Sequence, residues 1–96
     1  MKLSLWFILE TNLTMPELSR FFGIVVKMFY NEHQPAHFHA QYSGSEVVIN
    51  IDTLGIIRGH LPPRAMGLVM EWAAHHQEEL KNEWKNAMIL KPLREN

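Results

Sequence analysis

Residues 37–52 read HFHAQYSGSEVVINID, and this stretch decides the fold. Polar and apolar side chains alternate on both sides of a short Ser/Gly segment, which is typical of a β-hairpin with one buried face. A two-residue turn at Gly44-Ser45, with glycine at its first position, pairs Tyr42 with Val47. The alternation continues outward from that pair, so the apolar rows of both strands share one face.

This register gathers polar side chains on the opposite face. It sets His37 opposite Asp52 at the open end of the hairpin. A second turn, at residues 53–55, returns the chain in a third strand and sets Asn50 opposite Arg58. The predicted polar face carries these side chains: His37, His39, Gln41, Asn50, Asp52, Arg58 and, if the third strand runs that far, His60.

The chain as a whole divides into two parts. Residues 1–14 are expected to be an N-terminal extension or packing arm, and residues 15–96 a single domain. The apolar run near the start is too short to span a bilayer. Phe21–Tyr30 is rich in aromatic and β-branched residues of both parities, which predicts a central strand with Gly23 as a bulge.

A helical pattern follows the strands. Apolar side chains recur at spacings of three and four between Ala65 and Met88, so a helix is expected to begin near Pro63. A straight helix of that length would overshoot the sheet, which favours a break near His75-His76. The expected fold class is α+β: an antiparallel three- to four-stranded meander, then one long or two short C-terminal helices on one face. The polar face should point away from the helical tryptophans.

Composition excludes several classes of function. The 96 residues contain no cysteine, which rules out disulfides, thiolate metal sites and thiol catalysis. Nine basic and ten acidic residues give a formal charge of −1, so no global field attracts nucleic acid or an acidic membrane. We expect a cytoplasmic protein with no membrane partner.

The chain contains the motifs His33-x-Pro35-x-His37-Phe38-His39, Ile49-x-Ile51-Asp52, Leu61-Pro62-Pro63-Arg64-Ala65 and Glu71-Trp72-Ala73. Together they resemble the motifs of the small bacterial domain-of-unknown-function 4160 family. The resemblance covers Met15 to about Leu93 and implies that Met15 is the usual start. Members resemble halves of toxin–antitoxin-like two-gene modules, and the resemblance assigns no catalytic residue. His60 departs from it, since relatives tend to carry an acidic residue there.

Protein binding is the first functional hypothesis. Met66 and Met70 lie away from the main helical stripe, and methionines adapt readily to partners. They could instead complete the core. Arg64 is either an anchor at the helix start or a contact to a partner or phosphate, and Asn50 is a further binding candidate. The expected partner is the product of a neighbouring gene or a second copy of this chain.

Metal-independent RNA cleavage is the second hypothesis. His37 and His39 could act as general base and acid, because imidazole titrates near neutrality. Arg58 could hold the phosphate with its bidentate fork, and Asp52 could orient His37. The near-neutral charge counts against RNA as the substrate, since nucleases usually carry a basic groove.

Metal binding is the third hypothesis. His37 and His39 lie two apart on one strand face and can offer two imidazoles to one ion, with His33 from the preceding loop as a third ligand. Asp52 could serve as a carboxylate ligand or orient a ring. Zinc or nickel would suit such a site, and no other cofactor is expected. Alternatively, the strand histidines simply hydrogen-bond across the sheet.

Overall fold

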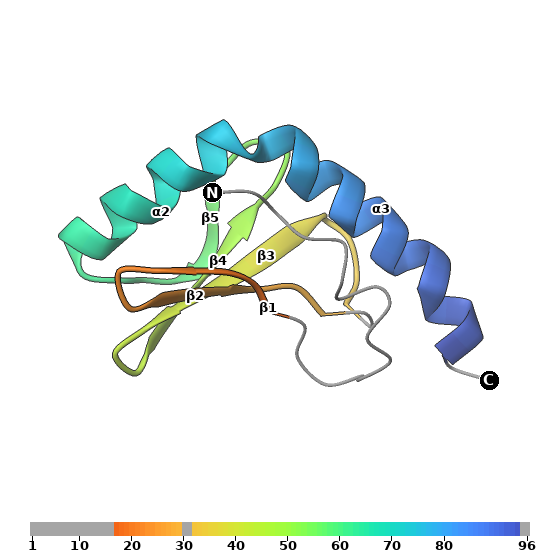
Figure 1. The fold of residues 1–96 in the computed structure, drawn as a ribbon, viewed down its shortest axis with the longest axis horizontal. Helices are drawn as coiled ribbons and strands as arrows, with labels where there is room; N and C mark the ends of the chain where they lie inside the picture. Colours follow the sequence, from red (N-terminus) through yellow and green to blue (C-terminus); the bar gives the residue numbers. More distant parts are fainter. Residues whose placement is uncertain (1–16, 30–31, 95–96) are drawn as a thin grey trace.

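The computed structural model describes residues 17–29 and 32–94. They form a five-stranded antiparallel meander followed by two helices, which run along one face of the sheet (Figure 1). The α+β class and the two-helix alternative are confirmed, with five strands instead of three to four. The predicted extension, residues 1–14, lies outside the described residues. The elements are β1 Glu17–Phe21, β2 Ile24–Lys27, β3 His37–Tyr42, β4 Ser45–Asn50, β5 Ile56–Gly59, α2 Pro63–His75 and α3 Gln77–Arg94.

The additional strand arises within the predicted central strand. Phe21 ends β1 and pairs with Ile24 of β2, so the chain reverses at Phe22-Gly23. Both turn residues have positive φ, 50° and 79°, as a tight two-residue hairpin turn requires. The prediction of one strand with a bulge at Gly23 is therefore wrong. Apolar residues on both sides of the turn had concealed it.

The central hairpin is displaced by two residues from its predicted register. Its turn is Ser43-Gly44, with φ of 49° and 85°, and Tyr42 pairs with Ser45 instead of Val47. Because side chains alternate with a period of two, a shift of two leaves every residue on its predicted face. The pairing of His37 with Asp52 is lost, since His37 lies opposite Asn50.

The second hairpin also differs from the prediction in register. Arg58 pairs with Val48 instead of Asn50, again a shift of two that keeps Arg58 on the polar face. The side chain of Asn50 accepts hydrogen bonds from the backbone amides of Asp52 and Thr53, at 2.7 and 3.0 Å. Asn50 is thus a turn former, a common role for asparagine.

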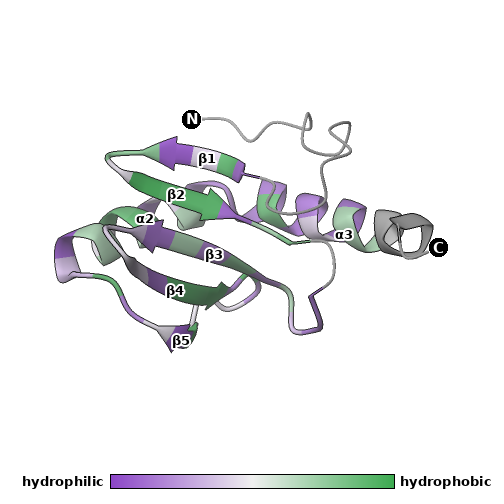
Figure 2. Ribbon diagram, turned by 90° about the horizontal axis from the view of Figure 1, so that it is seen from below, coloured by the Kyte–Doolittle hydropathy of each residue, from purple (hydrophilic) through white to green (hydrophobic). Residues whose placement is uncertain are grey.

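The helices cover the apolar face and are separated at His76. The amide of His76 donates to the carbonyls of Trp72 and Ala73, at 3.1 Å each, which closes α2 at the predicted break. Trp72 stacks on Phe21 with ring centroids 5.6 Å apart. Figure 2 shows the sheet with the helices beyond it. The fully buried large side chains are Phe38, Ile24, Met28, Ile49, Ile51, Leu80, Val26, Val47, Val48 and Val69. Among the described residues, no helix combines the length and apolar character needed to cross a membrane.

Gly59 provides a test of the packing between β4 and β5. Its φ is +80°, and a Cβ there would lie 2.2 Å from the carbonyl oxygen of Glu46. Gly44 has a similar φ of +85° but nothing within 4 Å of its would-be Cβ. We expect Gly59→Ala to lower the free energy of unfolding by about 3 kcal/mol or more, and Gly44→Ala by about 1–2 kcal/mol. Urea denaturation measures both, and equal losses would contradict the close approach.

Glu83 should make stability depend on pH. It is 2% exposed on α3, and burial, with the neighbouring charge of Glu79, raises its pKa to about 7. Between the ordinary glutamate value of 4.5 and about 7, the unfolded chain releases this proton while the folded chain keeps it. The free energy of unfolding therefore falls as pH rises through that range, by on the order of 2 kcal/mol, and Glu83→Gln removes the fall. Unfolding of both proteins from pH 5 to 8 tests this; parallel profiles would refute it.

Candidate functional site

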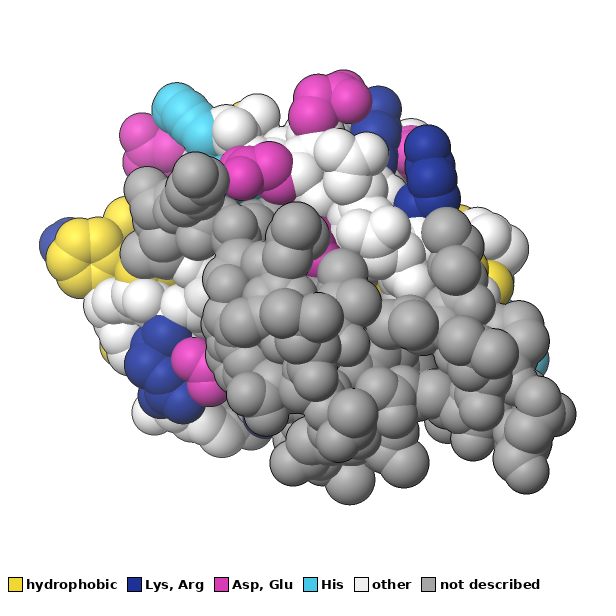
Figure 3. Space-filling view, turned by 45° about the vertical axis from the view of Figure 1, so that its right-hand side comes forward, with side chains coloured by type: hydrophobic (Ala, Val, Ile, Leu, Met, Phe, Trp, Pro, Cys, Tyr) yellow, Lys and Arg dark blue, Asp and Glu magenta, His cyan; other side chains and the backbone are white. Residues whose placement is uncertain are grey.

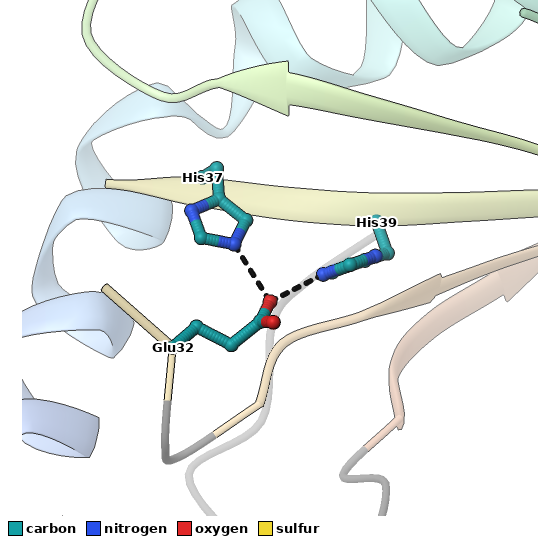
Figure 4. A group of neighbouring side chains, drawn as sticks. All are labelled: Glu32, His37 and His39. Atoms are coloured by element: carbon teal, nitrogen blue, oxygen red, sulfur yellow. Dashed lines mark hydrogen bonds and ion pairs between the residues drawn. The ribbon is translucent and has the colours of Figure 1, made fainter. Parts of the chain in front are cut away.

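Three side chains converge on the polar face of the sheet (Figure 4). His37 and His39 lie two residues apart on β3, so both rings project from the same side of the strand. Glu32, in the loop between β2 and β3, reaches between them. Its Oε1 lies 2.6 Å from Nε2 of His37 and 2.5 Å from Nε2 of His39. The three candidate ligand atoms lie within 4.8 Å of one another.

The other nitrogen of each ring also faces an oxygen. Nδ1 of His37 is 2.7 Å from the carbonyl oxygen of Pro35, and Nδ1 of His39 is 3.2 Å from Oε2 of Glu46. A carbonyl can only accept, so Nδ1 of His37 carries a proton. A neutral imidazole has one N–H, yet all four ring nitrogens face oxygens. The cluster therefore needs additional protons, or a cation in their place.

Apolar side chains enclose this cluster. His37 and His39 are buried; the ring of Phe29 meets His39 edge-on at 4.6 Å, and the ring of Trp84 lies 5.1 Å from His37. The expectation that the polar face avoids the tryptophans is therefore wrong at His37. Trp84 belongs to α3, and Figure 1 shows α3 continuing past the end of the sheet.

His37 and His39 stabilise the negative charge of Glu32. Burial by itself would raise the pKa of this carboxyl. Hydrogen bonds from His39 and His37, together with their positive charge, outweigh burial and hold the pKa below its ordinary value. Glu32 is therefore a carboxylate, the form that binds cations.

The structure brings together only some of the predicted catalytic and metal-binding residues. Arg58 lines a cavity of about 220 Å³ together with Glu32, His33 and His37. His33 is exposed and does not belong to the converging cluster. Asp52 is exposed in the turn after β4.

The predicted binding residues are dispersed. Asn50 shapes the turn after β4, as described above. Arg64 is exposed in the first turn of α2, where it lines an apolar cavity of about 150 Å³ together with Phe22 and others. Met66 and Met70 are half-buried and pack against the core, which leaves only part of each for a partner.

Sequence reasoning missed two acidic residues of the site. Glu32 lies in a polar, proline-containing loop, and alternation cannot position a loop side chain. Its signal was an acidic residue in the loop five residues ahead of the first of two same-face histidines. Glu46 faces Gln41 across the hairpin and also accepts its side-chain N–H at 3.1 Å. The correct register would have placed Glu46 diagonally beside His39.

Surface charge offers no support for a nucleic-acid groove on the face drawn in Figure 3. Basic and acidic side chains of the described residues are interspersed there. This agrees with the formal charge of −1. The described side chains of that face form no continuous basic track for a phosphate backbone.

A comparison with protein families gives one match. A family model described as a domain of unknown function (DUF4160) matches residues 23–85, roughly two thirds of the chain. The matched segment includes all three converging side chains. No curated protein and no solved structure matches the chain.

Replacing the shared acceptor should destabilise the metal-free protein. Glu32→Gln removes the negative charge that both imidazoles contact, and we expect the free energy of unfolding at pH 7 to fall by about 1–3 kcal/mol. Glu71→Gln, at an exposed position of α2, is the matched control and should change it by less than about 0.5 kcal/mol. Urea denaturation measures both; equal effects would mean that the contacts of Glu32 contribute nothing.

Proposed function

Since the chain belongs to the DUF4160 family, whose description names no activity, we propose its function from the site: the domain binds one divalent transition-metal ion. The ligands are Oε1 of Glu32 and Nε2 of His37 and His39. One observation carries the proposal. Both Nε2 atoms and a carboxylate oxygen converge while oxygen acceptors hold the opposite ring nitrogens.

The type of ligand selects the type of metal. Calcium and magnesium prefer sites built of oxygen. Two imidazoles and one carboxylate suit zinc, which catalytic sites bind with three protein ligands and one open position. Ferrous iron also accepts two histidines and one carboxylate on one face of its coordination sphere. The proposed ion is therefore zinc or ferrous iron, with at least one position left for water or a substrate.

The surroundings of the rings match those of metal-bound histidines. Such histidines usually donate Nδ1–H to a backbone carbonyl or a carboxylate, which fixes the tautomer and aims Nε2 at the ion. Pro35 supplies a carbonyl to His37, and Glu46 supplies a carboxylate to His39. Both rings are thus oriented with Nε2 toward Glu32.

Metal binding requires a movement of Glu32 away from the two rings. Two ligand atoms about 2.0–2.1 Å from a tetrahedral ion lie roughly 3.3 Å apart. The carboxylate of Glu32 approaches both Nε2 atoms more closely than that, at 2.5–2.6 Å. It must withdraw by about 0.7 Å. Its position in a loop, with 30% of the side chain exposed, permits this shift.

The other two functions have weaker support. Ribonuclease chemistry needs imidazole nitrogens that face the substrate, whereas those of His37 and His39 are occupied by Glu32, Pro35 and Glu46. Binding to a neighbouring gene's product in a toxin–antitoxin-like module stays a prediction. One feature favours it: Phe22 is 79% exposed at the turn between β1 and β2, where it borders an apolar cavity of about 150 Å³.

Zinc titration tests the proposal. Untagged protein, stripped with a chelator, should take up one equivalent of zinc in competition with a chromophoric chelator. His37→Ala and His39→Ala should each weaken zinc binding by about 100-fold or more, because each removes a direct ligand. His33→Ala and His60→Ala remove exposed imidazoles and should leave the affinity within about twofold.

The control variants separate two ligand sets. If His33→Ala weakened zinc binding as much as His39→Ala, the ion would lie on the three histidines predicted from the sequence, without Glu32. If wild-type protein bound no zinc or ferrous iron more tightly than the His37→Ala variant, the metal function would be refuted. Circular dichroism of each variant excludes loss of fold as the cause.

A further inference from the structure

A cavity lies beside the cluster and is lined by two of its three residues, Glu32 and His37. It has a volume of about 220 Å³, several times the volume of a water molecule. Among the described residues that line it, Arg58 is the only lysine or arginine. The remaining lining residues are Glu32, His33, Gln34, Pro35, His37, Val48 and Ile57.

Sheet register brings Arg58 to this cavity. His39 pairs with Val48, and Val48 pairs with Arg58, so the three occupy neighbouring strands in one row. With strands about 4.8 Å apart, the backbones of His39 and Arg58 are separated by about 10 Å. Val48 lies between them and is fully buried, so it forms a floor across which the arginine can extend toward the cluster.

The guanidinium of Arg58 is available to a ligand. Within the part of the chain that the structure describes, it makes no hydrogen bond or ion pair, and Arg58 is exposed. Arg20 of β1, by contrast, is paired: its guanidinium donates two hydrogen bonds to the carboxylate of Glu17. An unpaired guanidinium beside a divalent ion creates a local positive field, in a protein whose overall charge is −1.

We propose that this cavity binds a phosphate group, with one oxygen on the metal ion and two others on the guanidinium of Arg58. This inference rests on the metal site proposed above. A phosphate has enough oxygens to reach the ion and still offer two to the planar fork of an arginine. A carboxylate has only two oxygens, so its contacts with the ion and with the fork compete.

Calorimetric titration with inorganic phosphate tests the assignment. The probe is added to zinc-loaded wild type, zinc-loaded Arg58→Gln and zinc-loaded Arg64→Gln, and to metal-free wild type. Arg58→Gln should weaken phosphate binding at least tenfold while keeping one equivalent of zinc. Arg64→Gln, an exposed arginine outside this cavity, should change it less than twofold. Metal-free protein should bind at least tenfold more weakly than the zinc form.

The possible outcomes separate this inference from the metal proposal. If wild-type protein binds no metal, both fall. If zinc binds at the cluster but Arg58→Gln binds phosphate as tightly as wild type, the phosphate site is refuted and the metal site stands. Equal affinity with and without zinc would also refute it, since the ion would then make no contact. Acetate binding more tightly than phosphate to the zinc-loaded protein would overturn the choice of ligand.

Discussion

The contact of one carboxylate with two imidazoles organises the polar face of this protein. Glu32 meets Nε2 of both His37 and His39, and the hydrogen bonds from the two rings, reinforced by their charge, keep its pKa low despite burial. Because carbonyl or carboxylate oxygens also face both Nδ1 atoms, the cluster must hold excess protons or a cation. In the metal site proposed above, a divalent ion would take the place of the protons between Glu32 and the two Nε2 atoms.

Sheet and helices together position this contact. The period of two along β3 places both imidazoles on one side, and the loop between β2 and β3 carries Glu32 across them. Phe29, which follows β2, packs against the ring of His39. Trp84 packs against the ring of His37, which it can reach because α3 extends past the end of the sheet. Partial burial strengthens electrostatic interactions within the cluster, and the cavity lined by Arg58 leaves one side accessible.

Alternation predicted faces correctly and pairings incorrectly. Both hairpin registers differ from the prediction. The central hairpin is displaced by two residues because Ser43 takes the left-handed conformation that was assigned to glycine alone, and the pairing of β4 with β5 contains an irregularity between Val48 and Ile49. A shift of two preserves parity, so His37, His39 and Arg58 remained on one face although Asp52 was lost from it. Alternation could not predict where the side chain of Glu32 lies, since its position depends on the course of a loop. The break at His76 was predicted correctly. The rise per residue of a helix is fixed, so the number of residues alone shows that one straight helix would be longer than the sheet.

The most direct test of the account is the coordination of the two imidazoles, observed by long-range proton–nitrogen NMR of the histidine rings during addition of zinc. We expect the Nε2 resonances of His37 and His39 to shift together and saturate at one equivalent, with both Nδ1 atoms protonated and the rings of His33 and His60 unchanged. Shifts confined to His33 or His60, or coordination through Nδ1 of His37, would contradict the account.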